Sequence, residues 1–417
     1  MTTEATRSRW QRLSIIGLCE THVDCVNRTA PVVSEPTPYK MLRTTNVRDG
    51  YVDTVNVRYV TDETYQRWTR RLVPKRGDII LTREAPLGGV GKLRTDDLVF
   101  LGQRLYQFRP DSQKLDADFL LYSLLGSDLQ SQIKAFGSGS TVEHMRLEDI
   151  PSLELNVPSL AVQRRIGRIL SAYDELIENS QRRIKILETM ARALYREWFV
   201  HFRFPGHEHH PCVPSPLGEI PQGWEEKRIG DTFHAVLGGT PSRARSEFWD
   251  GGTIPWINSG KVNDLRITEA SELITPLALE KSAAKLMPKG TTVLAITGAT
   301  LGQVSYLEID TAANQSVVGI IDPSSMRSEW IYLTMSERIQ AIIKHASGGA
   351  QQHINKEIVS DVQVALPPDS LAKDFKGLVA PMFRELATLL FQVQNLRRTR
   401  DLLLPRLLSG QIDIEVA

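Results

Sequence analysis

The chain has 417 residues, of which 41% are hydrophobic and 24% are charged; this balance is typical of folded globular proteins and excludes a largely disordered chain. Its length predicts two or three domains. The net charge is +1: residues 1–205 carry 30 Lys and Arg against 25 Asp and Glu, whereas residues 206–366 carry 13 against 18. Overall charge therefore does not indicate a nucleic-acid binder, and any DNA binding must use local patches or positive charge from a partner.

The cysteine count and the hydropathy pattern predict a cytoplasmic protein. Cys19, Cys25 and Cys212 are too few for a disulfide framework, and no CxxC pair suggests a structural zinc site. No run of about 18 apolar residues is long enough to span a membrane. Residues 1–10 are polar and lack the apolar segment of a signal peptide, so we expect reduced thiols and no membrane contact.

The first part of the chain predicts a β-rich body with short helices. Residues 78–82 predict a strand entered from a Lys-Arg-Gly turn, and residues 98–108 predict further strand. Residues 118–126 predict a helix with Asp118 as a possible N-cap.

A long helix is predicted over residues 166–198. Its apolar residues recur at alternating spacings of four and three, with one polar interruption at Ser180, and this is the pattern of a coiled coil. A helix of this length spans roughly 50 Å at 1.5 Å per residue, more than a small domain needs. The alternative is an amphipathic helix that packs only on its own domain. The predicted coiled-coil contacts are Ile166, Leu170, Tyr173, Ile177, Ile184, Leu187 and Leu194.

The segment after this helix predicts a linker followed by a second β-rich body. Residues 204–224 contain five prolines, which favours a connecting segment. Residues 292–296 and 316–321 predict strands, and residues 328–343 predict a helix with Ser328 as a possible cap.

A second long helix follows the second body and shows the same heptad spacing, with Arg400 as its polar interruption. The predicted contacts in this helix are Phe375, Val379, Met382, Leu386, Leu389, Val393, Leu396 and Leu403.

The two halves of the chain repeat each other at an offset of 209 residues. Adding this offset to Ile166 and Leu187 gives Phe375 and Leu396, and the other apolar positions of the first helix likewise fall on apolar positions of the second. The repeat predicts an α+β fold in which two tandem β-rich bodies are each followed by a long helix. The bodies differ in residue identity but keep their apolar framework, so we expect one scaffold that presents two different surfaces.

Motifs of known enzymes are missing from the sequence. It contains no GxxxxGK[ST], HExxH or GxSxG motif. The His and Cys residues within 207–212 lie in the proline-rich segment without regular ligand spacing, which favours a solvated loop over a zinc site. We therefore expect neither catalytic residues nor a bound metal.

Two polar loops occupy matching places in the two halves, at residues 139–144 and 349–353. Their Gln, Ser, Thr and His side chains are of the types that hydrogen-bond to base edges and phosphates; ordinary polar loops are the alternative interpretation. The candidate DNA-binding residues are Arg83, Gln103, Arg104, Ser140, Thr141, His144 and Arg146 in the first half, and Asn258, Lys261, Gln303, Gln315, Gln351, Gln352 and Lys356 in the second.

Four segments, taken in order, resemble one known family. They are Gly-Glu-Ile-Pro-Gln-Gly-Trp at 218–224, Thr-Gly-Ala-Thr-Leu-Gly at 297–302, the glycine-rich loop at 348–353 followed by Leu-Pro-Pro at 366–368, and Leu-Pro-Arg-Leu-Leu-Ser-Gly-Gln-Ile at 404–412. Together they resemble the DNA specificity subunit of type I restriction-modification systems, and the resemblance covers essentially the whole chain.

This resemblance implies a non-catalytic subunit with two target recognition domains, each reading half of a split DNA sequence. The expected boundaries are 1–158 for the first domain, 159–204 for the central helix, 205–366 for the linker and second domain, and 367–417 for the distal helix and tail. The two helices are expected to pair antiparallel as a coiled coil that spaces the readers.

The implied partners are double-stranded DNA, two methyltransferase subunits and restriction-translocase subunits. S-adenosylmethionine, ATP and Mg²⁺ are expected on those subunits, with no cofactor on this chain. Because the second body is net acidic, it is expected to bind DNA weakly without partners. A coiled-coil scaffold whose bodies bind proteins is the alternative from another class.

Overall fold

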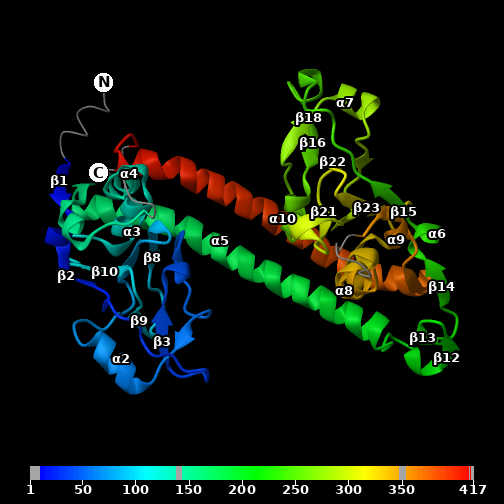
Figure 1. Ribbon diagram of the computed structural model, residues 1–417, viewed down its shortest axis with the longest axis horizontal. Helices are drawn as coiled ribbons and strands as arrows, with labels where there is room; N and C mark the ends of the chain where they lie inside the picture. Colours follow the sequence, from blue (N-terminus) through cyan, green and yellow to red (C-terminus); the bar gives the residue numbers. More distant parts are fainter. Residues whose placement is uncertain (1–9, 138–142, 347–353, 413, 415–417) are drawn as a thin grey trace. The chain divides into compact units, whose positions relative to one another are not determined.

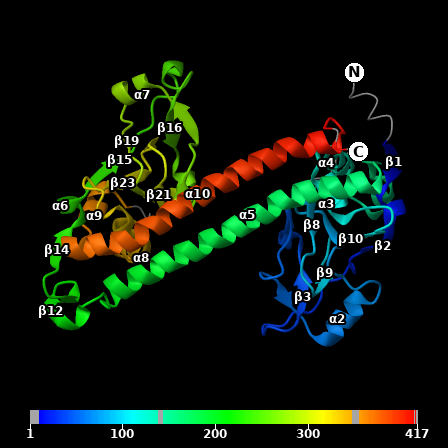
Figure 2. The same cartoon turned by 180° about the vertical axis from the view of Figure 1, so that it is seen from behind.

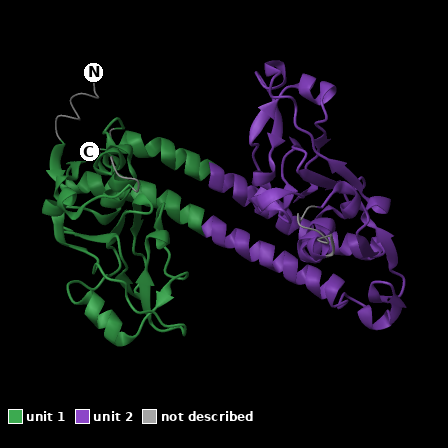
Figure 3. Ribbon diagram, viewed as in Figure 1, with its two compact units in different colours: residues 1–178, 395–417 green, residues 179–394 purple. Residues whose placement is uncertain are grey.

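The computed structural model describes residues 10–137, 143–346, 354–412 and 414. The chain divides into two compact units, one of residues 1–178 with 395–417 and one of residues 179–394 (Figure 3). We call these unit 1 and unit 2, in that order.

The body of unit 1 is built on a six-stranded mixed sheet (Figure 1). Its strand order is β2 (Cys19–Asp24), β10 (Leu105–Pro110), β7 (Ile79–Arg83), β8 (Leu87–Lys92), β5 (Gly50–Val52) and β4 (Val47–Arg48). A smaller sheet contains β6 (Arg58–Tyr59), β3 (Tyr39–Leu42) and β9 (Leu98–Leu101) and carries α2 (Asp62–Thr69). Two further helices, α3 (Ala117–Leu125) and α4 (Ser127–Phe136), pack against β8. The apolar face of α3 and the strands form one core, in which Ile79, Phe108 and Phe119 are buried.

Two details of unit 1 differ from the sequence expectations. Residues 98–108 form two strands in different sheets, because Gly102 to Arg104 make a turn between β9 and β10. The cap of α3 is Asp116, whose carboxylate accepts hydrogen bonds from the backbone N–H groups of Asp118 and Phe119. Asp118 lies inside the helix and pairs with Lys92 at 2.5 Å.

The body of unit 2 repeats this plan. Its five-stranded sheet has the order β15 (His234–Leu237), β23 (Val317–Ile321), β20 (Thr292–Ala295), β21 (Val304–Leu307) and β17 (Arg266–Ile267). Its second sheet contains β18 (Glu272–Ile274), β16 (Ile254–Ile257), β22 (Thr311–Ala313) and β19 (Leu286–Met287). The helices of this body are α6 (Ile229–Thr232), α7 (Pro276–Lys281), α8 (Ser328–Ala346) and α9 (Lys356–Ser360).

Strand pairing confirms that the halves are copies of one topology. Strands β5 and β8 pair parallel in unit 1, as β17 and β21 do in unit 2. The parallel pair β3 and β9 likewise matches β16 and β22. In each half, the strand before the body pairs antiparallel with the strand before the long helix: β1 (Gln11–Ser14) with β11 (Glu154–Val157), and β14 (Glu225–Arg228) with β24 (Gln363–Leu366).

The proline-rich segment is more structured than a linker. It contains a hairpin of β12 (Cys212–Ser215) and β13 (Gly218–Pro221). Phe204, Ile220 and Trp224 are buried in the core of unit 2. Pro221 is the last residue of the hairpin, and Trp224, three residues later, is buried in that core. The segment is therefore part of the folded second body.

The two long helices, α5 (Leu160–Tyr195) and α10 (Asp369–Leu408), run antiparallel (Figure 2). In unit 1 the first part of α5 pairs with the last part of α10 through Asp174 and Arg400; in unit 2 the last part of α5 pairs with the first part of α10 through Arg183 and Glu385. All fifteen predicted coiled-coil side chains are buried or half-buried. Several also enter the body cores, Ile166 and Leu170 in unit 1 and Phe375 and Val379 in unit 2. The helices therefore pack both on each other and on their own bodies. In the part of the chain that the structure describes, no helix is long and apolar enough to cross a membrane.

Candidate nucleic-acid interface

In unit 2, several polar loops meet at one edge of the five-stranded sheet. Strands β15 and β20 end at this edge and β23 begins there, because both pair antiparallel with β23. The backbone N–H of Ile354 donates to the carbonyl of Ile296 at 3.1 Å, which brings the chain entering α9 to the same place. We call this loop cluster, residues 238–240, 296–303, 314–316 and 354–356, the unit 2 edge.

Close backbone packing holds the unit 2 edge together. A Cβ atom on Gly238 would lie 2.2 Å from the carbonyl oxygen of Asn314, so only glycine allows this approach. Two residues further along this loop, the hydroxyl of Thr240 donates a hydrogen bond to the side-chain oxygen of Gln315. Asn258 lies beside this cluster because β16 and β22 run parallel and end together, and the N–H of Asn314 bonds to the carbonyl of Ile257 at 3.0 Å.

The structure gathers four of the seven predicted residues of the second half. Asn258, Gln303 and Gln315 are exposed, and Lys356 is half-buried at the start of α9. Lys261 is different, because its ammonium group is 2.9 Å from both Asp264 and Glu269. Although burial alone would lower the pKa of Lys261, hydrogen bonds to these carboxylates raise it above its usual value. Lys261 therefore stays charged but is engaged within the protein. Gln351 and Gln352 lie outside the described residues.

The equivalent edge in unit 1 is formed where β2 and β7 end and β10 begins. Glu84 forms an isolated antiparallel bridge with His144, and the N–H of Met145 donates to the carbonyl of Arg83 at 2.9 Å. Gln103 and Arg104 occupy the turn before β10. We call residues 83–85, 102–104 and 144–146 the unit 1 edge.

The predicted basic residues of unit 1 have three different environments. Arg83 is only 6% exposed, and its guanidinium donates a hydrogen bond of 2.9 Å to the carbonyl of Met145. Its side chain therefore stabilises the unit 1 edge and does not face solvent. Arg104 has a left-handed backbone, with φ of 67°, and pairs with Glu84 at 3.1 Å. The side chain of Arg146 is 72% exposed and pairs with the equally exposed Glu148 at 3.2 Å. An exposed pair such as Arg146 with Glu148 is weak, so Arg146 can exchange its partner for a phosphate group. The pair of Arg104 with Glu84 is half-buried.

Ser140 and Thr141 lie outside the described residues, whereas Gln103 is exposed and His144 half-buried at the unit 1 edge. Thr240 and Asn314 lie at the unit 2 edge but were not among the residues predicted from the sequence. Arg43 follows β3 as Asn258 follows β16, so the repeat makes these two residues equivalent in position.

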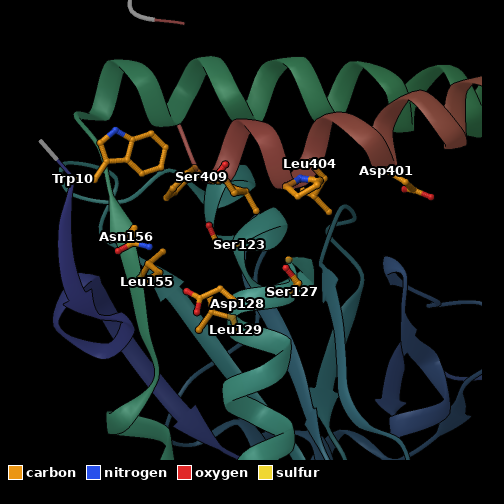
Figure 4. Close-up of a pocket in the computed structure, with 14 residues that line it drawn as sticks. Trp10, Ser123, Ser127, Asp128, Leu129, Leu155, Asn156, Asp401, Leu404 and Ser409 are labelled. Carbon is orange, nitrogen blue, oxygen red and sulfur yellow. The ribbon is translucent and has the colours of Figure 1, made fainter. Parts of the chain in front are cut away.

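Unit 1 also contains a pocket of about 610 Å³, and none of the predicted DNA-binding residues is among the residues that line it. Figure 4 shows its walls: Trp10, the start of α4 at Ser127 and Asp128, and the end of α10 at Leu404. Among the described residues, no group of three or more His, Cys, Asp or Glu side chains is placed to hold a metal ion.

Comparison with known proteins defines the family. The type I restriction modification DNA specificity domain matches the chain twice, at residues 33–189 and 221–374. The two matches cover well over half of the chain, which therefore belongs to this family.

Two curated relatives are similar over most of their length. The type I restriction enzyme MjaIX specificity subunit of Methanocaldococcus jannaschii is 26% identical over 363 residues, covering 86% of this chain and 82% of the relative. The HindI specificity subunit of Haemophilus influenzae is 24% identical over 402 residues, covering 81% and 87%. The crystal structure of a type I restriction-modification S subunit from M. genitalium shares the fold, with a TM-score of 0.64 and 16% identity over 95% of this chain and 96% of that one.

Proposed function

We propose that this chain recognises a bipartite double-stranded DNA sequence, with one half-site read at each edge, and recruits methyltransferase subunits that act on it. The main observation that supports this proposal is the repeated topology, which places polar loops of different sequence at equivalent sheet edges. The chain also belongs to the DNA specificity family. Direct readout of a DNA sequence needs polar side chains that reach the base edges. Basic groups around them bind the DNA phosphates and fix the position of the protein on the duplex.

In this proposal the chain is a recognition subunit without catalysis. Adenine methylation requires the base to leave the stack, and the pocket that receives it would belong to a methyltransferase partner. S-adenosylmethionine, ATP and Mg²⁺ would likewise be held by partner subunits. The recognition domains would comprise residues 1–158 and 205–366, and the helices would space them in a cytoplasmic complex.

The test compares the purified chain with the chain co-expressed with a methyltransferase subunit. We expect the chain alone to transfer no labelled methyl group and to shift random DNA weakly, because the second body is net acidic. The co-expressed complex should bind tightly and methylate one split sequence. Methyl transfer by the partner-free chain, or a complex with no DNA preference, would contradict the proposal.

We further expect Gln315→Ala to relax recognition at one half-site only. An amide can make a bidentate contact with adenine worth about 1–3 kcal/mol of discrimination, and Gln315 is exposed at the unit 2 edge. Sequencing of methylated sites from a random library would show the loss. Gln222→Ala is the matched control, because Gln222 is an exposed glutamine of unit 2 outside that edge. Unchanged preference at both halves would remove Gln315 from the interface.

A further inference from the structure

Each unit contains a buried charged cluster where its body meets both long helices. In unit 1 the carboxylate belongs to Asp174 of α5, whose side chain is 1% exposed. It accepts a hydrogen bond of 2.6 Å from the hydroxyl of Tyr122 on α3, and the Nη1 atom of Arg400 on α10 lies 2.6 Å away. One carboxylate thus joins the body, α5 and α10.

In unit 2 the carboxylate belongs to Glu188, also on α5. It accepts a hydrogen bond of 2.9 Å from the hydroxyl of Tyr332 on α8, and Arg266 of β17 lies 3.3 Å away. The guanidinium of Arg266 is fully buried and lies 3.8 Å from the ring centre of Phe383 on α10. The same three parts of the unit are again connected.

The two clusters use different residues at comparable places. Tyr122 and Tyr332 are equivalent in the repeat, since each lies on the first helix after the last strand of its main sheet, α3 after β10 and α8 after β23. The carboxylates are not equivalent in the repeat. Adding the offset of 209 residues to Asp174 gives Phe383, which carries no carboxylate. Each body has therefore acquired its own polar connection to the helix pair, which a merely inherited contact would not explain.

Protonation keeps both connections intact at neutral pH. Burial first, and then the charge of Glu188, raise the pKa of Tyr332 to about 12, so that its hydroxyl remains a donor. Burial and the charge of Asp174 raise the pKa of Tyr122 in the same way. For Arg400, hydrogen bonds to Asp174 and Asp401 raise the pKa although burial opposes them.

Buried ion pairs contribute little net stability but are satisfied in only one geometry, and their best-attested role is to fix register. Apolar contacts between a body and the helices would tolerate sliding and rocking. A shift of about 3.4 Å at the reading loops corresponds to one base pair along the DNA. Control of the body's angle is therefore control of where its half-site falls.

We infer that Asp174 with Tyr122 and Arg400, and Glu188 with Tyr332 and Arg266, are positioning residues that fix the angle of each body on the helix pair. They thereby set the length of the unread gap between the half-sites. The inference rests on the proposed function.

The test is Asp174→Asn in the full chain, co-expressed with a methyltransferase subunit. The matched control is Asp78→Asn. Asp78 is also a 1% exposed carboxylate of unit 1, paired with Arg109 at 2.8 Å, but both residues lie within the body. Tyr122→Phe is a milder second variant, because it removes one hydroxyl and leaves the ion pair with Arg400 in place. The substrate is a DNA library in which both half-sites are constant and the gap varies.

We expect Asp174→Asn and Tyr122→Phe to increase methylation at gaps one base pair too short or too long by about tenfold, the effect of losing one charge-assisted hydrogen bond. Base preference within each half-site should stay unchanged. Asp78→Asn should lower thermal stability and keep a single gap.

A single wild-type gap in both Asp174→Asn and Tyr122→Phe would overturn the inference, as would equal broadening in Asp78→Asn. A wild-type complex with no preference for a split sequence would overturn the proposed function as well. If the wild-type complex methylates its split sequence and the variants recognise the same single gap, only the inference about the positioning residues is overturned.

Discussion

Replacing Arg266 with alanine is expected to destabilise unit 2 by about 3–5 kcal/mol, the usual consequence of removing one partner from a buried ion pair. The guanidinium lies 3.3 Å from Glu188 and 3.2 Å from Glu308, and both acids are nearly inaccessible to water. Its loss leaves two carboxylates close together without that counter-charge and opens a void beside Phe383. Hydrogen exchange of the amides in β20 and β21 would report the change, because those strands form the centre of the sheet.

Arg243→Ala provides a matched comparison. Arg243 also pairs with a glutamate, Glu272 at 2.6 Å, and also stacks on an aromatic ring, that of Trp249 at 3.6 Å. Its side chain is about half exposed, so its loss should cost less than about 1 kcal/mol. Equal protection of the β20 and β21 amides against hydrogen exchange in the two variants would contradict this expectation. It would show that burial does not determine how much each arginine contributes to the stability of unit 2.

Lengthening both long helices by seven residues is expected to lengthen the recognised gap by about three base pairs. Seven residues add about 10 Å of helix and nearly restore the same face, since 3.6 residues make one turn. The insertions would follow Gln181 in α5 and Gln394 in α10, so that each cluster stays with its own unit. Methylated-site sequencing measures the gap directly.

Four residues inserted after Gln181 alone should give a different result. This insertion adds about 6 Å and turns the following segment by about 40°. It offsets Arg183 from Glu385 while leaving the contact between Asp174 and Arg400 in place. We expect loss of assembly or a changed gap. Full activity at the original gap in both variants would show that the helices do not space the readers.

The long helices could be predicted from sequence because heptad spacing is a local signal that extends over many turns. The spacing did not reveal which neighbours those residues contact, and Ile166 lies in the core of the unit 1 body as well as on the helix pair. The cap of α3 shows a similar limit: Asp116 and Asp118 both suit a helix start, and the choice depends on Lys92, which is 26 residues from Asp118.

The candidate interface was only partly predictable. The repeat located the equivalent loops, but it could not distinguish a side chain that faces solvent from one that turns inward. Arg83 turns inward to the carbonyl of Met145, 62 residues away. Glu188 and Arg266 were not predicted at all, because a charged residue on a helix gives no local sign that it will be enclosed.

The position of Glu188 determines which piece of this chain can be exchanged with a relative. The repeat suggests a junction after the first long helix, but a foreign second body joined there would face a carboxylate selected for Arg266. The compact unit of residues 179–394 instead carries both Glu188 and Arg266, so an exchange of this segment keeps the ion pair together. Exchanges of this unit should therefore keep the buried pair intact, whereas exchanges at the repeat boundary would require a compensating change on α5.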